Sequence, residues 1–256
     1  MHPVLFKLGP FTLHTYGFML AVGAGLGLLL LGRLARKNSL DPDKVLNLAL
    51  WVLISGIVGS RLVYVLLEPQ QFIARPWRVF YFWEGGLVFY GGLAGGLLAG
   101  VILIRRGRLP LWPVLDCFAP ALALGQAFGR LGCFFAGCCY GLPHEGWCSV
   151  VFNNPRTLAP RGVSIYPTQL FHAAELFALT GFLLLIWPRR RFGGQIFFTY
   201  GMVHGAARVI IEQFRGDWRG APVLAGLTPT ALAALALALL SAFGYFYLAS
   251  KDKKGK

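Results

Sequence analysis

Charged residues are scarce in this sequence. Asp, Glu, Lys and Arg make up 13% of its 256 residues, whereas soluble globular domains carry roughly a quarter. Hydrophobic residues make up 56%. This composition excludes an intrinsically disordered chain, a collagen, a coiled coil and a small disulfide-stapled secreted domain. It predicts a protein embedded in a membrane.

Other features are also lacking. We find no internal repeat, low-complexity stretch or separate soluble domain, so we expect one polytopic membrane domain over residues 1–256. The first residues lack the basic start and the small-residue cleavage site of a signal peptide, and none is expected. The five cysteines lack the paired spacing of common zinc and iron–sulfur sites, so we expect no metal.

Long apolar runs predict an all-α integral membrane protein, because about 20 helical residues cross a bilayer core. We expect seven transmembrane helices, at Tyr16–Leu31, Val45–Leu67, Gly86–Ile104, Val114–Phe128, Tyr166–Trp187, Gln195–Phe214 and Leu227–Leu248. The fourth run is the weakest, since it is short and contains Asp116 and Pro120. Glycines recur in these runs, as expected where membrane helices pack closely.

Basic residues outnumber acidic ones by 24 to 10, and fourteen of them lie in alternate connections and the C-terminal tail. They are Arg33, Arg36, Lys37, Lys44, Arg105, Arg106, Arg108, Arg189, Arg190, Arg191, Lys251, Lys253, Lys254 and Lys256. With seven spans these segments share one side, which the positive-inside rule assigns to the cytoplasm. We therefore expect the N-terminus outside and the C-terminus in the cytoplasm. Clusters at membrane ends fit lipid headgroups better than nucleic acid, so no nucleic-acid partner is expected.

Three arginines lie in or beside the apolar runs: Arg61, Arg130 and Arg208. An intramembrane arginine costs about 2.5–3.5 kcal/mol on insertion scales, so it faces a partner or a polar cavity. An ion pair of Arg208 with Glu212, or with Asp116 of another helix, is the structural alternative. Arg215 and Arg219 lie nearby in the sequence. Together these arginines favour an anion site, because guanidinium groups bind phosphate oxygens bidentately, and a phospholipid headgroup is the available anion.

The connection over residues 130–165 is expected on the extracytoplasmic side. It opens with a segment, residues 129–141, that has four glycines in 13 residues. Such a segment predicts irregular, close-approach backbone lining a cavity. A second connection, over residues 68–84, carries several aromatic residues and is expected to be an interfacial arm.

Short motifs along nearly the whole chain resemble those of the prolipoprotein diacylglyceryl transferase family. Within residues 129–141 the family signature G-R-x-G-N-F-x-N-x-E-x-x-G is matched at Gly129, Arg130, Gly132, Phe134 and Gly141. The other matching positions are Tyr16-Gly17, Gly59-Ser60-Arg61-Leu62 with Tyr64, Glu84-Gly85-Gly86-Leu87, Gly91-Gly92-Leu93, Asp116 with Pro120, Pro167-Thr168-Gln169-Leu170, and Arg208, Glu212 and Arg215. Besides the signature, six motifs occur in the order of the family, with residues 84–87 and 91–93 counted as one motif.

The sequence departs from the family at several polar positions. Tyr90 and Tyr166 replace histidines, and His204 replaces a tyrosine. Cys133 and Ala136 replace the two asparagines of the signature, Cys138 replaces its glutamate, and Phe171-His172 replaces a Tyr-Glu pair.

The resemblance implies an enzyme of the bacterial cytoplasmic (inner) membrane with seven helices and no cofactor. Its reaction transfers the diacylglyceryl group of phosphatidylglycerol to the lipobox cysteine thiol of a prolipoprotein, forming a thioether and releasing glycerol phosphate. The implied partners are phosphatidylglycerol and the lipobox peptide.

For this reaction we expect Arg130 and Arg208 to hold the phosphate and Glu212 to orient Arg208. His204 is the expected base, because it lies one helical turn before Arg208 and imidazole transfers protons near neutral pH. Tyr90 is expected to donate a hydrogen bond to the lipid headgroup or to the leaving group. The remaining expected lipid-binding residues are Tyr16, Arg61, Gly129, Gly132 and Gly141.

Four cysteines, Cys133, Cys138, Cys139 and Cys148, fall within 16 residues. A disulfide and plain packing of small thiols both account for them, and Cys117 is expected to serve packing. The cluster leaves a rival function open, a membrane thiol–disulfide oxidoreductase that uses quinone. A non-catalytic lipid-binding protein is the other alternative.

Overall fold

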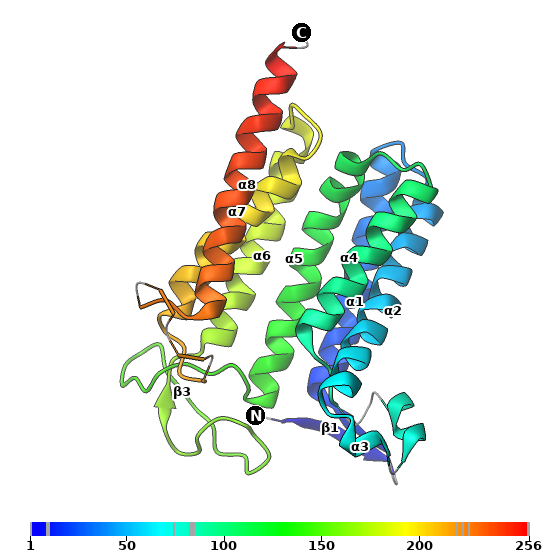
Figure 1. The fold of residues 1–256 in the computed structure, drawn as a ribbon. Helices are drawn as coiled ribbons and strands as arrows, with labels where there is room; N and C mark the ends of the chain where they lie inside the picture. The colour runs from blue at the N-terminus through cyan, green and yellow to red at the C-terminus, as the bar shows by residue number, and fades with distance from the viewer. Residues whose placement is uncertain are drawn as a thin grey trace. The chain divides into compact units, whose positions relative to one another are not determined.

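The computed structural model describes residues 2–8, 11–73, 75–81, 85–218, 220–221, 223–224 and 226–254. Over these residues it contains seven helices of 18 residues or more (Figure 1). They are α1 (Thr15–Lys37), α2 (Pro42–Leu67), α4 (Phe89–Arg106), α5 (Leu111–Ala136), α6 (Thr168–Ile186), α7 (Gln195–Glu212) and α8 (Pro229–Lys254). Each coincides with one of the seven predicted apolar runs.

The chain divides into two compact units, and each is described here by itself. The first unit comprises Met1–Leu31 and Leu115–Lys256, and the second comprises Gly32–Val114. The expectation of one membrane domain stays a prediction.

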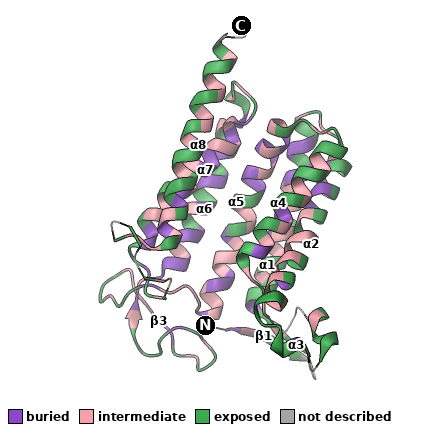
Figure 2. Cartoon of the chain, viewed as in Figure 1, coloured by how far each residue is buried: buried purple, intermediate pink, exposed green. Residues whose placement is uncertain are grey.

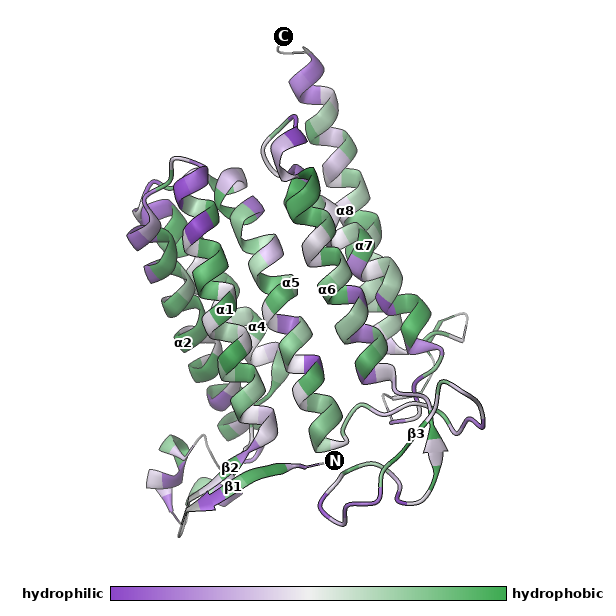
Figure 3. Cartoon of the chain, turned by 180° about the vertical axis from the view of Figure 1, so that it is seen from behind, coloured by the Kyte–Doolittle hydropathy of each residue, from purple (hydrophilic) through white to green (hydrophobic). Residues whose placement is uncertain are grey.

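Six of the long helices are long and apolar enough to cross a membrane, and α7 is outside that set. Although α7 has 18 residues, it carries His204, Arg208 and Glu212, which lower its hydropathy. The apolar windows of α2 and α4 are only 6% buried, and that of α8 is 17% buried (Figure 2). The green of α8 in Figure 3 gives way to hydrophilic residues in its last turns. Exposed apolar surfaces of this extent suit helices that face lipid.

Two small sheets, which were not predicted from the sequence, accompany the mostly helical fold. Strands β1 (Val4–Leu8) and β2 (Phe11–His14) form an antiparallel pair just before α1, and β3 (Val150–Val151) pairs with β4 (Ser164–Ile165). The strand pattern at the start of the chain is too short to stand out beside the apolar runs.

The fifth helix corrects a prediction. Residues Gly129–Ala136, which we expected to be irregular, continue α5, and the turn begins only at Gly137. Pro120 lies inside this helix without ending it. The connection expected over residues 130–165 is therefore shorter, because α5 continues to Ala136. Gly132 serves close helix packing, since a Cβ there would lie 3.2 Å from the ring and the carbonyl oxygen of Tyr16.

In the first unit α6, α7 and α8 lie side by side (Figure 1). Gly205 lets α7 approach α8 closely, since a Cβ there would lie 2.7 Å from the carbonyl oxygen of Ala234. The buried carboxylate of Asp116 on α5 accepts hydrogen bonds from the backbone N–H groups of Gly194 (2.8 Å) and Phe197 (2.9 Å) at the start of α7. Asp116 thus caps α7 and is not the partner of Arg208.

In the second unit α2 packs on α4 through small residues. A Cβ at Gly95 would lie 2.5 Å from the carbonyl oxygen of Ser55, so only glycine allows this approach. The expected interfacial arm holds the short helices α3 (Gln70–Ile73) and η1 (Pro76–Phe80). Phe82, Trp83 and Glu84 of this arm lie outside the described residues.

Candidate active site

Arg208 on α7 makes two polar contacts inside the first unit. Its Nη2 lies 3.4 Å from Oε2 of Glu212, one turn further along the same helix, as expected from the i,i+4 spacing. Its Nη1 lies 3.3 Å from Nε2 of His172 on α6. The guanidinium is therefore held between a carboxylate and an imidazole, and a fixed guanidinium suits phosphate binding.

His172 is fully buried and was not among the predicted site residues. It lies within electrostatic reach of Arg130, Arg208 and Arg215, which come from α5, α7 and the turn after α7. Its Nδ1 has no hydrogen-bond partner among the described residues. One signal in the sequence could have revealed His172. It comes directly after Phe171 and the Pro167-Thr168-Gln169-Leu170 motif. Three cations around one buried imidazole make a site for an anion.

Arg130 on α5 is half-buried and forms no ion pair with any described carboxylate. Arg215 differs, because its Nε and Nη2 donate to the two oxygens of Asp217 at 2.9 and 2.8 Å. The guanidinium of Arg130 thus remains available to an anionic ligand, whereas Arg215 is already neutralised. Arg219, which we grouped with Arg215, lies outside the described residues.

Glu212 is buried and held from the side of α8. Thr228 donates to its Oε1 at 3.2 Å, and Thr230 makes a short hydrogen bond to the same oxygen. Glu212 also lies 4.0 Å from Arg215 Nε. Beside it a cavity of about 270 Å³ is lined by residues that include Arg215, Trp218 and Thr228. Glu212 can therefore orient Arg208, as predicted from the sequence.

His204 on α7 is paired with a carboxylate that sequence reasoning missed. Its Nδ1 lies 3.2 Å from Oε2 of Glu175 on α6, and the ring of Tyr200 stacks on it at 5.5 Å between centroids. A carboxylate at Nδ1 holds an imidazole so that its Nε2 can accept a proton. Glu175 could have been found, since a carboxylate inside the predicted span Tyr166–Trp187 is costly and marks a functional site.

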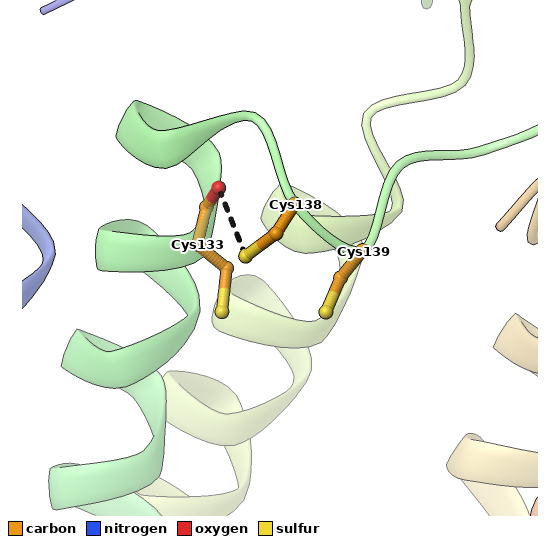
Figure 4. A group of neighbouring side chains, drawn as sticks. All are labelled: Cys133, Cys138 and Cys139. Atoms are coloured by element: carbon orange, nitrogen blue, oxygen red, sulfur yellow. Dashed lines mark hydrogen bonds between the residues drawn. The ribbon is translucent and has the colours of Figure 1, made fainter. Parts of the chain in front are cut away.

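The segment after α5 brings three thiols together. The Sγ atoms of Cys133, Cys138 and Cys139 all lie within 4.8 Å of one another (Figure 4). Cys138 Sγ donates a hydrogen bond to the carbonyl oxygen of Cys133 at 3.8 Å (Figure 4). The neighbouring Cys133 and Cys138, together with Arg215, lower the pKa of the Cys139 thiol, whereas Cys133 and Cys139 raise the pKa of the Cys138 thiol. None of the five cysteines forms a disulfide in the part of the chain that the structure describes, and Cys148 lies outside this group of three.

Gly141 and Leu142 follow the same segment, and their backbone N–H groups bond to residues that flank α6 and α7. Gly141 N–H donates to the carbonyl oxygen of Tyr166 at 3.1 Å, and Leu142 N–H donates to that of Phe214 at 2.8 Å. The segment therefore ties the start of α6 to the end of α7.

Comparison with known proteins assigns this chain to a family. Residues 3–247 match the family model described as prolipoprotein diacylglyceryl transferase. The chain belongs to this family. Similar proteins include the phosphatidylglycerol–prolipoprotein diacylglyceryl transferases of Clostridium tetani, with 34% identity over 86% of this chain and 88% of the relative, and of Synechococcus elongatus, with 35% identity over 84% and 77%. That of Gloeobacter violaceus is 33% identical over 96% of this chain and 92% of its own length.

Tyr16 lies at the start of α1, close to the signature of the family. It packs beside Gly132 and is within electrostatic reach of Arg130 and of the three thiols. Its side chain is about 42% exposed, so it borders the site rather than filling it. Gly129 has only ordinary contacts, with Leu20 Cδ1 3.9 Å from the position of a Cβ.

Two further predicted residues, Arg61 and Tyr90, belong to the second unit. Arg61 is buried and donates to the carbonyl oxygens of Arg78 (2.6 Å), Gly85 (2.7 Å) and Val79 (3.0 Å). Backbone carbonyls thus occupy its guanidinium, which ties residues 78–79 and 85–86 to α2, and we leave Arg61 out of the lipid site. Tyr90 is 72% exposed at the start of α4, and its role as a donor stays a prediction.

Proposed function

We propose that this protein transfers the diacylglyceryl group of phosphatidylglycerol to the lipobox cysteine of a prolipoprotein, forming a thioether and releasing glycerol phosphate. Membership of the family and the printed names of the relatives support this reaction. The observation that carries it in this chain is Arg208, held 3.4 Å from Glu212 and 3.3 Å from the buried His172, with Arg130 within electrostatic reach of the same imidazole. A cationic site among apolar helices fits a phospholipid headgroup better than a quinone.

In the proposed reaction Arg130 and Arg208 hold the phosphate of the lipid. The thiolate attacks the glyceryl carbon bonded to the phosphate, and negative charge develops on the leaving oxygen. Preorganised guanidinium groups stabilise that charge most strongly where water is excluded. Glu212 keeps Arg208 in place through the contact described above, so no reorganisation is needed during the reaction.

His204 is the proposed base for the thiol proton. The reference pKa of a cysteine thiol is about 8.5, so a base favours the thiolate at neutral pH. Glu175 holds the imidazole of His204 at Nδ1, which supports proton transfer at Nε2.

The proposed setting is the bacterial cytoplasmic (inner) membrane. We propose that all seven long helices span it, including α7, whose polar residues would face the arginine site rather than lipid. The N-terminus is proposed to lie outside and the C-terminus in the cytoplasm, on the strength of the basic residues in alternate connections.

A direct assay tests the proposal. Purified protein is incubated with phosphatidylglycerol and a lipobox peptide, and mass spectrometry detects the thioether while glycerol phosphate is quantified. We expect both products in equal amounts, none with phosphatidylcholine, and none from Arg130→Gln. Arg105→Gln is the matched control, since Arg105 is exposed at the end of α4. Lipid binding without product would favour the non-catalytic alternative.

A further inference from the structure

Three cysteine thiols converge on one point beside the arginine site. Cys133 lies in the last turn of α5, and Cys138 and Cys139 follow in the next turn of chain. Their sulfur atoms lie within 4.8 Å of one another, and Figure 4 shows the three side chains pointing toward the same space. The spacing in the sequence concealed this arrangement, because one thiol comes from a helix and two come from a turn.

The backbone that presents these thiols is held in an uncommon conformation. Cys139 has a φ of 61°, and Gly137 has a φ of 76°. A residue other than glycine rarely adopts such an angle, and where it does the conformation is often part of a functional site. The turn places Cys139 next to Cys138 and Cys133 instead of letting the chain continue away from α5.

Two buried side chains of α6 clamp this turn. Thr168 Oγ1 donates to the carbonyl oxygen of Cys139, and Gln169 Nε2 donates to that of Cys138, both at 2.8 Å. Thr168 and Gln169 are fully buried. A thiol cluster that served only to fill space would not need its backbone fixed at two successive carbonyls. The clamp preorganises the thiols, as ligands of a bound ion are preorganised.

Two guanidinium groups lie near the cluster. Arg215, whose side chain is only 2% exposed, is within electrostatic reach of Cys139 and is already paired with Asp217. Arg130 precedes Cys133 by three residues on the same face of α5 and lies within electrostatic reach of its thiol. Thiolates, not thiols, are the groups that bind metals.

We propose that Cys133, Cys138 and Cys139 bind one Zn²⁺ ion through three thiolates and leave its fourth position open to the substrate cysteine. Catalytic zinc sites have three protein ligands and one open position, and soft thiolates select such ions. Zinc–sulfur bonds of about 2.3 Å place tetrahedral ligands about 3.8 Å apart. The sulfur atoms therefore need to move only slightly.

This inference rests on the proposed function, for which it supplies a way of activating the thiol. The lipobox thiol loses its proton as it binds the ion. Its sulfur then forms a bond to the glyceryl carbon, and the bond from that carbon to the phosphate oxygen breaks. The electron pair leaves with glycerol phosphate, which takes up the released proton, and the ion is neither oxidised nor reduced.

Metal binding is measured first, without reference to activity. The full-length protein in detergent, reduced and kept free of oxygen, is equilibrated with Zn²⁺ or Co²⁺ and freed of excess ion. We expect one zinc per chain by mass spectrometry, and with Co²⁺ the absorption of tetrahedral thiolate coordination. Cys133→Ser, Cys138→Ser and Cys139→Ser should each lose stoichiometric binding. Cys148→Ser is the matched control and should keep it, since Cys148 follows in the same connection but lies outside the cluster.

Two results would overturn the inference. One is a wild-type protein that stays monodisperse, has all five cysteines titratable as thiols, and binds neither ion. The other is a mass decrease of two hydrogens that maps to a disulfide within the cluster of protein isolated without reductant. Thermal unfolding of each serine variant shows that lost binding does not come from misfolding.

The transfer assay separates this inference from the proposed function. If the protein binds zinc but forms no thioether, the proposed function fails and the metal site stands. If transfer by the triple serine variant and by the chelated protein equals that of the wild type, the proposed function stands and the role of the ion in thiol activation is wrong.

Discussion

Arg208 on α7 donates to the imidazole of His172 on α6, with Nη1 lying 3.3 Å from Nε2. A guanidinium has only donors, so Nε2 must be the acceptor and the proton of the neutral ring lies on Nδ1. That N–H is buried and has no partner among the described residues. The contact thus holds Arg208 at a fixed position beside a buried N–H that has no described partner.

The first prediction concerns the geometry of Arg208. Arg208→Lys keeps the charge but loses the planar fork that contacts Glu212 and His172 together. We expect the rate of diacylglyceryl transfer to fall about 100-fold or more, because one preorganised donor aimed at the developing charge is worth that much. Steady-state assays with phosphatidylglycerol and a lipobox peptide measure this, with Arg105→Lys as the control. Full activity of Arg208→Lys would contradict a bidentate role.

His172→Leu is expected to separate stability from activity. The substitution removes a buried N–H without a partner, whose burial costs about 1–3 kcal/mol. We therefore expect an unchanged or higher unfolding temperature together with a marked loss of transfer. Thermal unfolding in detergent and the transfer assay are compared on the same sample. A lower unfolding temperature with normal transfer would assign His172 to packing alone.

The third prediction concerns proton transfer by His204 and the support it receives from Glu175. If His204 is the base, His204→Ala should lower the rate about 100-fold or more, and Glu175→Gln should lower it less, since Glu175 acts through the imidazole. In the double variant Glu175→Gln should add little to the effect of His204→Ala, because the two residues act as one unit. His14→Ala, on an exposed strand residue, is the control. If His204→Ala keeps full activity while Arg130→Ala abolishes it, His204 is not the base.

Much of this structure follows from local patterns, and the remainder depends on how distant segments meet. Apolar runs predict all seven long helices because lipid demands continuous hydrophobic helix. The pairing of Arg208 with Glu212 follows from the i,i+4 spacing. The contact between Glu175 and His204 joins two helices and depends on their rotation, which no spacing records. The meeting of Cys133 with Cys139 depends on left-handed φ angles after α5, of which Gly137 gives a signal in the sequence and Cys139 gives none.

Arg61 shows the opposite error, since its cost in an apolar helix suggested a ligand that it does not need. We expect Arg61→Gln to lower the unfolding free energy by about 2–4 kcal/mol, because four backbone carbonyls lose a buried charged donor. The KM for phosphatidylglycerol should stay unchanged. Unfolding curves and KM values are measured beside those of Arg105→Gln. A raised KM without any change in stability would return Arg61 to the lipid site.

The last prediction concerns Gly129 and Gly141, the two ends of the glycine-rich signature, which differ in the space around them. A Cβ at Gly141 would lie 2.5 Å from the carbonyl oxygen of Tyr166 and 2.8 Å from that of Phe214, whereas one at Gly129 meets only Leu20 Cδ1 at 3.9 Å. Backbone oxygens cannot move aside, so Gly141→Ala should lower stability by about 2 kcal/mol or more. Gly129→Ala should be neutral or stabilise α5 by about 1 kcal/mol, since alanine favours helix. Denaturation of both variants under the same conditions checks this. Equal effects would mean that the 141 segment can shift, and the tie between α6 and α7 would then be less rigid than its contacts indicate.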